Sequence, residues 1–370
     1  MMQVMWTLVY ALSLLLVVRS KKYLHIATRD KLLLLLVGIA VVSVLWSAAP
    51  EVTLRRSAAL VGTTLFGIYL AARYDLGELL RLLAWALGIA ALLSLVFAIA
   101  LPSYGTQADY RGLVWRGVYI HKNILGYNMV LSAVVFLLLA LGDRRYRWVT
   151  WSGLGLSASL ILLSNSITSM ITLLALLTLL PLFWSLRWHY SLAVSLYTIA
   201  VLGSGILIFW LASNTESVLE AFGRDASLTG RTQLWEPVLE MIWQRPWLGY
   251  GYGGFWLGLE GKSALVWNVS GIYADHAHNG LLNVWLDLGL LGVSVFTLGF
   301  LLTLLRALAW ARLTKTAEGL WPLAFLSFML LHNVAETSLL LTNNVVWILY
   351  AAVVLLTVRK PRDRRGQVLK

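Results

Sequence analysis

LAVSLYTIAVLGSGILIFWL, residues 192–211, and GLLNVWLDLGLLGVSVFTLGFLLTLL, residues 280–305, are both long enough and apolar enough to cross a bilayer. A helix needs about 20 predominantly apolar residues to span the hydrocarbon core of a membrane. These runs flank a polar segment, residues 212–277, which interrupts an almost continuous series of similar runs. The arrangement predicts a chain that lies mostly in a membrane and carries one large extramembrane loop.

The composition indicates the same class, because 59% of the residues are hydrophobic and only 12% are charged. We predict an all-α polytopic membrane protein, a single membrane domain over residues 1–370 into which residues 212–277 are inserted. Eleven spans are predicted, at residues 2–18, 32–48, 57–73, 80–101, 124–141, 148–164, 168–185, 192–211, 280–305, 320–340 and 344–358. The first run lacks a basic flank before it, so we expect a retained helix with its N-terminus outside. The absence of cysteine excludes disulfides and thiolate metal sites.

The basic residues orient the predicted helices. With the N-terminus outside, the inner segments hold 20 of the 29 Lys and Arg residues. This asymmetry follows the positive-inside rule. The net charge of +12 is therefore explained by topology, and a nucleic-acid partner is not expected. The large loop is placed outside.

Most of the basic residues predicted to lie outside are arginines. Three outer loops carry the candidate ligand-binding groups: Arg55 and Arg56; Arg111 and Arg116 followed by His121, Lys122 and Asn123; and Arg231 and Arg245 in the long loop. Arginine is suited to bidentate recognition of phosphate. The alternative is that these side chains hold lipid headgroups. Arg231 and Arg245 are preferred because each lies beside a Gly or Pro that restricts the local backbone.

The long loop is predicted to contain a helix over residues 232–244, capped by Thr229 or Ser227. Trp235, Leu239, Ile242 and Trp243 are predicted to form its apolar stripe, with the helix on the outer membrane surface. The glycines of residues 248–255 would allow close approach of a ligand or of another segment. Tryptophans in this loop could stack on sugars, but tryptophan also gathers at membrane interfaces regardless of function.

Two histidines, His276 and His278, precede the apolar run at residues 280–305. Histidine is the usual general base near neutral pH, and a helix start also favours an anion. Capping and metal binding are the alternatives, although only Asp275 accompanies the pair at a ligand-like spacing. Asp287, His332 and Glu336 are ionisable groups within predicted spans, where they serve either catalysis or bonding between helices. His332 and Glu336 are spaced to share one helix face.

Four motifs together resemble the superfamily of O-antigen ligases, Wzy-type polymerases and exopolysaccharide polymerases. They are GVYIHKNILG at residues 117–126, Gly230-Arg231-Thr232 with Trp235, RPWLGYG at residues 245–251, and HNGLL at residues 278–282. The resemblance covers roughly residues 45–350, in order and at family-like spacing. It implies a helical bundle of the GT-C type with a large periplasmic loop in the bacterial inner membrane. Many relatives have twelve spans, so the eleven counted here could omit one.

The resemblance also implies a chemistry used in lipopolysaccharide and exopolysaccharide biosynthesis. The donor would be a glycan on undecaprenyl diphosphate, transferred with inversion and without metal or cofactor to a glycan or lipid-linked acceptor. His278 matches the family's essential histidine, Arg231 its loop arginine, and Arg116, or alternatively Arg111, the arginine before the His-Lys-Asn stretch. His276, Arg245, His121, Lys122, Asn123 and Asn279 are expected to contact substrate, with Arg55, Arg56, Glu336 and Asp287 in support. Membrane lipids and a chain-length regulator are the other expected partners.

Three functions remain open from the sequence. The His121-Lys122-Asn123 run favours a polymerase, and an O-antigen ligase that delivers glycan to lipid A–core is the first alternative. A lipid-linked sugar transporter is the more remote alternative. Transporters concentrate polar groups near the bilayer midplane, whereas the Arg and His residues of this chain concentrate at its predicted outer surface.

Overall fold

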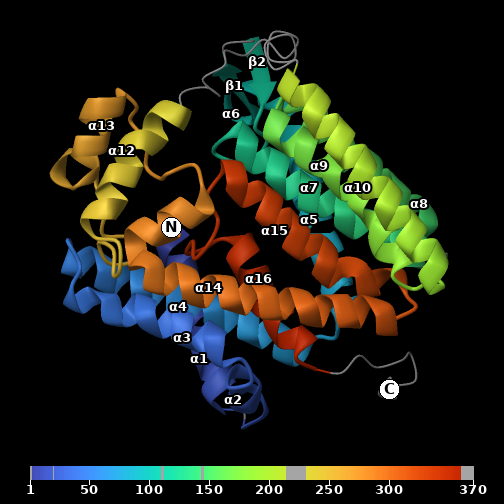
Figure 1. The fold of residues 1–370 in the computed structure, drawn as a ribbon, viewed down its shortest axis with the longest axis horizontal. Helices are drawn as coiled ribbons and strands as arrows, with labels where there is room; N and C mark the ends of the chain where they lie inside the picture. Colours follow the sequence, from blue (N-terminus) through green and yellow to red (C-terminus); the bar gives the residue numbers. More distant parts are fainter. Residues whose placement is uncertain (1, 20, 110–111, 143–145, 214–230, 360–370) are drawn as a thin grey trace. The chain divides into compact units, whose positions relative to one another are not determined.

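The computed structural model describes residues 2–19, 21–109, 112–142, 146–213 and 231–359 of the chain (Figure 1). The helices are α1 Met2–Arg19, α2 Lys21–Ala27, α3 Lys31–Val42, α4 Pro50–Arg73, α5 Leu76–Ala100, α6 Pro102–Gly105, α7 Lys122–Gly142, α8 Arg147–Leu163, α9 Ile167–Ser185, α10 Tyr190–Ser213, α12 Arg231–Gln244, α13 Ser263–Ser270, α14 Gly280–Leu313, α15 Trp321–Ala335 and α16 Val345–Thr357. Short 3-10 helices lie at Ser43–Leu45, Gly258–Glu260 and Ala317–Leu320. Strands β1 Thr106–Asp109 and β2 Gly112–Trp115 pair antiparallel.

The all-α membrane class is confirmed, and a helix occupies each predicted span within the described residues. Four helices there are long and apolar enough to cross a membrane: α5, α7, α9 and α14. Shorter apolar helices lie at Met5–Val17, Lys31–Leu45, Tyr190–Gly205 and Val345–Thr357. The number of spans and the GT-C architecture stay predictions.

The chain divides into two compact units. The first contains Met1–Tyr69, Trp188–Leu302 and Asn333–Val354, and the second contains Leu70–Arg187, Thr303–His332 and Leu355–Lys370. In the second unit, α7 packs against α5, α8 and α9 (Figure 1). Buried side chains occur on all sides of α7, because its sequence is apolar around its whole circumference. Gly126 permits close contact with α9, since a Cβ there would lie 2.3 Å from the Ser169 hydroxyl.

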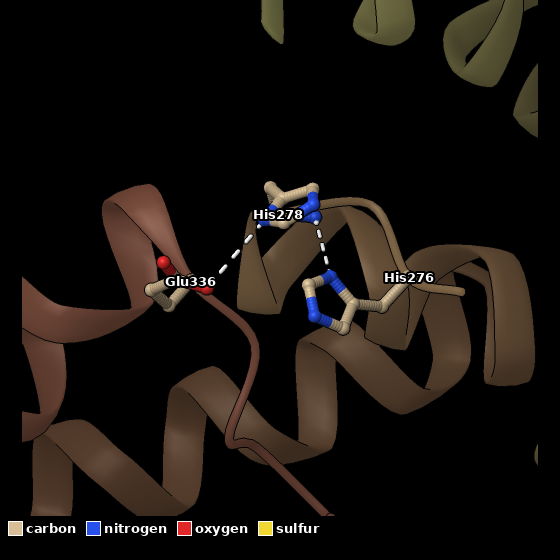
Figure 2. Close-up of side chains that lie close together, drawn as sticks. All are labelled: His276, His278 and Glu336. Atoms are coloured by element: carbon tan, nitrogen blue, oxygen red, sulfur yellow. Dashed lines mark hydrogen bonds and ion pairs between the residues drawn. The ribbon is translucent and has the colours of Figure 1, made fainter. Parts of the chain in front are cut away.

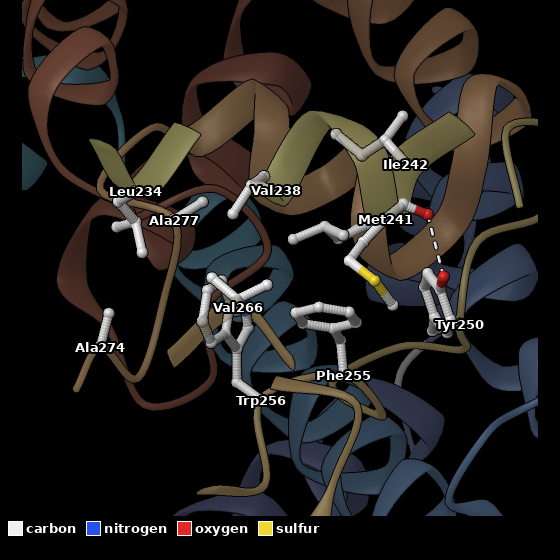
Figure 3. Close-up of a cluster of buried hydrophobic side chains, with 11 residues drawn as sticks. Leu234, Val238, Met241, Ile242, Tyr250, Phe255, Trp256, Val266, Ala274 and Ala277 are labelled. Carbon is white, nitrogen blue, oxygen red and sulfur yellow. Dashed lines mark hydrogen bonds between the residues drawn. The ribbon is translucent and has the colours of Figure 1, made fainter. Parts of the chain in front are cut away.

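In the first unit, the described part of the long loop has its own hydrophobic core (Figure 3). We call it the loop core, and its residues are Leu234, Val238, Met241, Ile242, Tyr250, Phe255, Trp256, Val266, Ala274, Ala277 and Leu286. Each large apolar side chain buried in this way contributes roughly 1.5–3 kcal/mol to folding before entropy is counted. The loop is therefore a folded element that can hold side chains in fixed positions.

The predicted loop helix is confirmed as α12, and of its predicted apolar stripe Ile242 is buried in the loop core and Trp235 is partly buried. Leu234, Val238 and Met241 face the loop core, whereas Leu239 and Trp243 are exposed. The buried positions are spaced four and three residues apart, so they also form one face of a helix. The sequence of α12 offers two apolar faces. The face that is buried is the one that packs against α13 and against the glycine-rich residues 248–255. The predicted caps Thr229 and Ser227 lie outside the described residues.

Helix α14 is broken at Gly289, where the backbone takes φ 65° and ψ −168°. The break exposes backbone groups that residues 246–250 satisfy. The amides of Leu290 and Leu291 donate to the carbonyl oxygens of Pro246 and Trp247, at 2.7 and 3.2 Å. A Cβ at Gly289 would lie 2.2 Å from the Trp247 carbonyl, so only glycine fits. The predicted span at residues 280–305 is thus two helical pieces held together by the loop.

The glycine segment, residues 248–255, also docks on the chain between α3 and α4. The Trp46 indole donates to the Leu248 carbonyl at 2.9 Å, and the Ala48 amide donates to the Tyr250 carbonyl at 2.8 Å. A Cβ at Gly251, which has φ 87°, would lie 2.5 Å from Ser47. Of the two uses predicted for these glycines, close approach to another protein segment is the one observed.

Candidate active site

The loop core fixes the two histidines through the alanine between them. Ala277 is completely buried, its carbonyl accepts a 2.9 Å hydrogen bond from the Trp235 indole, and its amide donates to the Asn283 side chain at 3.4 Å. His276 and His278 flank this anchored residue and remain partly exposed. The His-Ala-His order therefore presents both rings at the edge of the loop core.

The two rings contact each other edge to face, with centroids 4.1 Å apart and planes at 72° (Figure 2). The His278 amide donates to Nδ1 of His276 at 3.2 Å. His278 takes φ 48°, in the left-handed region that residues with a Cβ seldom occupy. A conformation of this kind costs on the order of 1–3 kcal/mol and persists only where its surroundings enforce it. Such strain is concentrated at functional sites, which marks His278 as a functional candidate.

Glu336 completes a three-residue cluster with the histidines (Figure 2). Its Oε2 lies 3.5 Å from Nδ1 of His278, and its side chain is 13% exposed. Glu336 was predicted only as a supporting residue on a shared helix face with His332. That geometry is wrong, because α15 ends at Ala335 and Glu336 lies in the turn beyond it. His332 instead stacks on Phe328, with the ring planes 7° apart.

Two asparagines and a glycine hold the start of α14 against the end of α15. The Asn279 side-chain oxygen accepts from the amides of Leu281 and Leu282, at 3.0 and 3.1 Å, and so caps α14. The Asn279 side-chain amide donates to the Val334 carbonyl at 3.3 Å. A Cβ at Gly280 would lie 2.3 Å from the Asn333 side chain. The His-Asn-Gly sequence thus fixes the position of His278 relative to the turn that carries Glu336.

The cluster of His276, His278 and Glu336 has the composition of a metal site, with candidate ligand atoms within 4.8 Å of one another. The hydrogen bonding of His276 opposes that use. Its Nδ1 accepts the His278 amide, so in the neutral ring Nε2 carries the proton and neither nitrogen offers a lone pair to a cation. Burial, followed by the proximity of His278, lowers the pKa of His276, which keeps this ring neutral. Asp275 and Glu336 act in the opposite direction. The hydrogen bond from the His278 amide therefore disfavours His276 as a metal ligand.

Three other predicted site residues of the first unit, Arg56, Arg245 and Asp287, contact the glycine segment. Arg56 donates to the Gly253 carbonyl at 2.7 Å, and Arg245 is exposed with its guanidinium 5.1 Å from the Tyr250 ring centroid. Asp287 is buried, with its carboxyl hydrogen-bonded by the backbone of Gly253. Arg55 is exposed. Arg231 begins α12, but its side chain lies outside the described part of the structure.

The remaining predicted residues belong to the second unit, where the structure gives them local roles. Arg116 donates to the carbonyl oxygens of Tyr104 and Ile120, at 3.0 and 3.3 Å. Nδ1 of His121 accepts from the Asn123 amide at 3.2 Å, which caps α7, and Lys122 forms an ion pair with Asp109. Arg111 lies outside the described residues. A contact between any of these residues and substrate stays a prediction.

Comparison with known proteins tests the resemblance predicted from the four motifs. Residues 152–297 match the family model described as O-antigen ligase, a range that contains α12, the loop core and both histidines. The exopolysaccharide production protein ExoQ of Rhizobium meliloti (strain 1021) is 27% identical over 273 residues, covering 70% of this chain and 61% of that relative. Both matches confirm the predicted resemblance to the O-antigen ligase and polymerase superfamily.

Proposed function

We propose that the protein is an inverting, metal-independent glycosyltransferase that uses a glycan on undecaprenyl diphosphate as donor. The acceptor is a sugar hydroxyl at the periplasmic face of the bacterial inner membrane, and the favoured product is an O-antigen or exopolysaccharide chain. One observation carries this proposal. His278 is held in a strained conformation, with Nδ1 facing a carboxylate, two residues before α14 begins.

The proposed reaction needs a base and groups that stabilise negative charge. His278 Nε2 takes the proton of the acceptor hydroxyl, and the hydroxyl oxygen bonds to the anomeric carbon on the side opposite the diphosphate. The bond from the anomeric carbon to the diphosphate oxygen breaks, and undecaprenyl diphosphate leaves with the electron pair. A single displacement of this kind inverts the anomeric carbon. Arginine side chains stabilise the charge that develops on the leaving diphosphate.

A polymerase and a ligase use different acceptors. The two matches point to different activities. The family model is described as an O-antigen ligase, whereas ExoQ is described as an exopolysaccharide production protein. A ligase delivers its glycan once to lipid A–core, and a polymerase extends a lipid-linked chain repeatedly. We favour the polymerase on the His121-Lys122-Asn123 run and retain the ligase as the alternative.

Reconstitution distinguishes these activities. We expect the full-length protein in proteoliposomes to convert lipid-linked repeat units, isolated from a source strain lacking the protein, into a ladder of longer chains. A ligase would give one transfer, and only when lipid A–core is supplied. EDTA should leave the rate unchanged, because neither nitrogen of His276 is available to a cation. Loss of activity in EDTA with recovery on adding Zn²⁺ would refute the metal-independent mechanism, and absence of both products would refute the glycosyltransferase.

The position of the loop is tested by cysteine labelling, which is direct because the chain has no native cysteine. Asn268 is exposed on α13, so we expect Asn268→Cys to react with an impermeant maleimide from the periplasmic side. Ser263→Cys is the matched control on the same helix. Ser263 is completely buried, so its variant should react only after denaturation. Labelling of Asn268→Cys only from the cytoplasmic side would contradict the proposed orientation.

A further inference from the structure

We propose that Glu336 is the positioning residue for the base: its carboxylate holds the Nδ1–H of His278, so that Nε2 faces the acceptor hydroxyl with a free lone pair. This inference rests on the proposed function and adds to it a specific pair of side chains. The two residues lie on segments far apart in the sequence, and the fold brings their side chains to 3.5 Å (Figure 2).

Hydrogen bonds of Asn333 fix the backbone turn that carries Glu336. After α15 ends, the Asn333 side-chain oxygen accepts from the amides of Ser338 and Leu339, at 2.8 and 3.2 Å, and its amide donates to the Ser338 hydroxyl. The turn that carries Glu336 is therefore closed by one buried side chain. The same Asn333 lies against Gly280, two residues after His278. These contacts hold the backbone turn that carries Glu336 next to the start of α14.

The negative charge of Glu336 favours one tautomer of the His278 ring, the one with its proton on Nδ1. Nδ1 of His278 is buried and faces the Glu336 carboxylate. A proton on Nδ1 is attracted by that carboxylate, which leaves Nε2 as the nitrogen that accepts a proton. When His278 takes the acceptor proton, the positive imidazolium forms beside a fixed negative charge in a partly desolvated site, where the attraction is stronger than in water. The separation of 3.5 Å is long for a hydrogen bond, and catalytic hydrogen bonds commonly shorten when substrate is bound.

Among the residues that the structure describes, Glu336, His276 and Asp275 are the titratable groups grouped with His278. Glu336 supplies the negative charge, His276 is the neutral ring on the other side, and Asp275 is almost fully exposed with its carboxylate 3.6 Å from His276. Solvent screens the exposed Asp275 carboxylate more strongly than the largely buried Glu336 carboxylate. Removing the Glu336 charge should make imidazolium formation harder. The acid limb of the pH profile should then move to lower pH.

The first test compares Glu336→Gln and Glu336→Asp with the wild type in the proteoliposome assay. For Glu336→Gln we expect kcat to fall about 10²-fold, KM for the donor to stay within about twofold, and the acid limb to shift about one pH unit lower. Glu336→Asp keeps the negative charge, so the pH profile should stay close to that of the wild type. Its shorter side chain places the carboxylate farther from the His278 ring, so kcat should be about tenfold lower. The matched control is Glu260→Gln, which neutralises an exposed carboxylate of the long loop. Its kcat, KM and pH profile should equal those of the wild type.

A second test does not depend on glycan transfer. Diethyl pyrocarbonate acylates neutral imidazole, so the pH dependence of His278 modification, followed by mass spectrometry, reports its protonation directly. We expect the midpoint of this curve to move lower in folded Glu336→Gln and to stay near wild type in Glu336→Asp and Glu260→Gln. If Glu336→Gln does not fold, Glu336→Ala takes its place with the same expected lower midpoint, and an unshifted midpoint in folded Glu336→Ala would overturn the pair.

The two proposals fail in different ways. An unshifted modification curve and an unchanged kcat in Glu336→Gln, with His278→Ala still inactive, would overturn the positioning role and leave the glycosyltransferase intact. A shifted curve in a protein that transfers no glycan would retain the Glu336–His278 pair and overturn the proposed function. Equal losses for Glu336→Gln and Glu336→Asp with no pH shift in either would reduce Glu336 to a structural residue.

Discussion

The His278→Ala variant is expected to lose glycan transfer by a factor of about 10³ or more while donor binding persists. General base catalysis by a positioned side chain contributes about 10²–10⁴-fold. His278 is the histidine whose Nδ1 faces Glu336, and its Nε2 is the proposed proton acceptor. Donor binding is assigned to the arginines, so it should survive the loss of the ring. The measurement is a comparison of transfer rate and donor binding in proteoliposomes.

Variants of His276 provide the matched comparison. His276 supports the His278 backbone through a 3.2 Å hydrogen bond, so His276→Ala should lose activity only in part. His276→Asn, whose side-chain oxygen can accept the same amide, should recover most of that loss. Wild-type transfer should fall as the pH is lowered, because a protonated imidazole cannot accept a proton. Full turnover by His278→Ala together with an inactive His276→Asn would show that the base has been assigned to the wrong histidine.

The Arg231→Lys variant is the second substitution with a large expected effect. Arg231 begins α12, immediately before the part of that helix that packs in the loop core. If its guanidinium binds the diphosphate through two parallel hydrogen bonds, lysine keeps the charge but loses that geometry. We expect transfer to fall about 10²-fold in Arg231→Lys and further in Arg231→Ala. Initial rates over a range of donor concentrations measure both the loss and its distribution between kcat and KM.

Two basic residues of the same loop serve as controls. Lys262→Ala removes one exposed positive charge and should stay within about twofold of the wild type, because solvent and salt screen an exposed charge. Arg224, which lies outside the described residues, is expected to give an equally mild alanine variant. A uniform decline in all three alanine variants would indicate a general attraction to an anionic surface. Undiminished transfer by Arg231→Ala would remove this residue from the site. Arg116 and Arg111 then become the arginines to test next.

Local sequence patterns were sufficient to predict the helices. Spans of apolar residues correctly located α5, α7 and α9, because a membrane-length run has few alternatives to a helix. The helix after Gly230 was also predictable from its local pattern, and the His-Asn-Gly sequence identified the start of α14. Periodicity alone did not determine which face of α12 is buried. Leu239 and Leu234 are equally apolar, and packing against α13 and the glycine segment decided between them.

The sequence by itself determined the membrane class, the positions of the helices, and the histidines and arginines that carry the resemblance. Tertiary structure alone decided the break of α14 at Gly289, the loop core, and the pairing of Glu336 with His278. The physical reason is the range of the interactions. Helix formation depends on neighbours within four residues, which a sequence pattern records. The contact between Glu336 and His278 depends on where two distant helix ends meet. The hydrogen bond that Asn279 donates to Val334 and the one that Asn333 accepts from Ser338 fix that meeting point only in the folded chain.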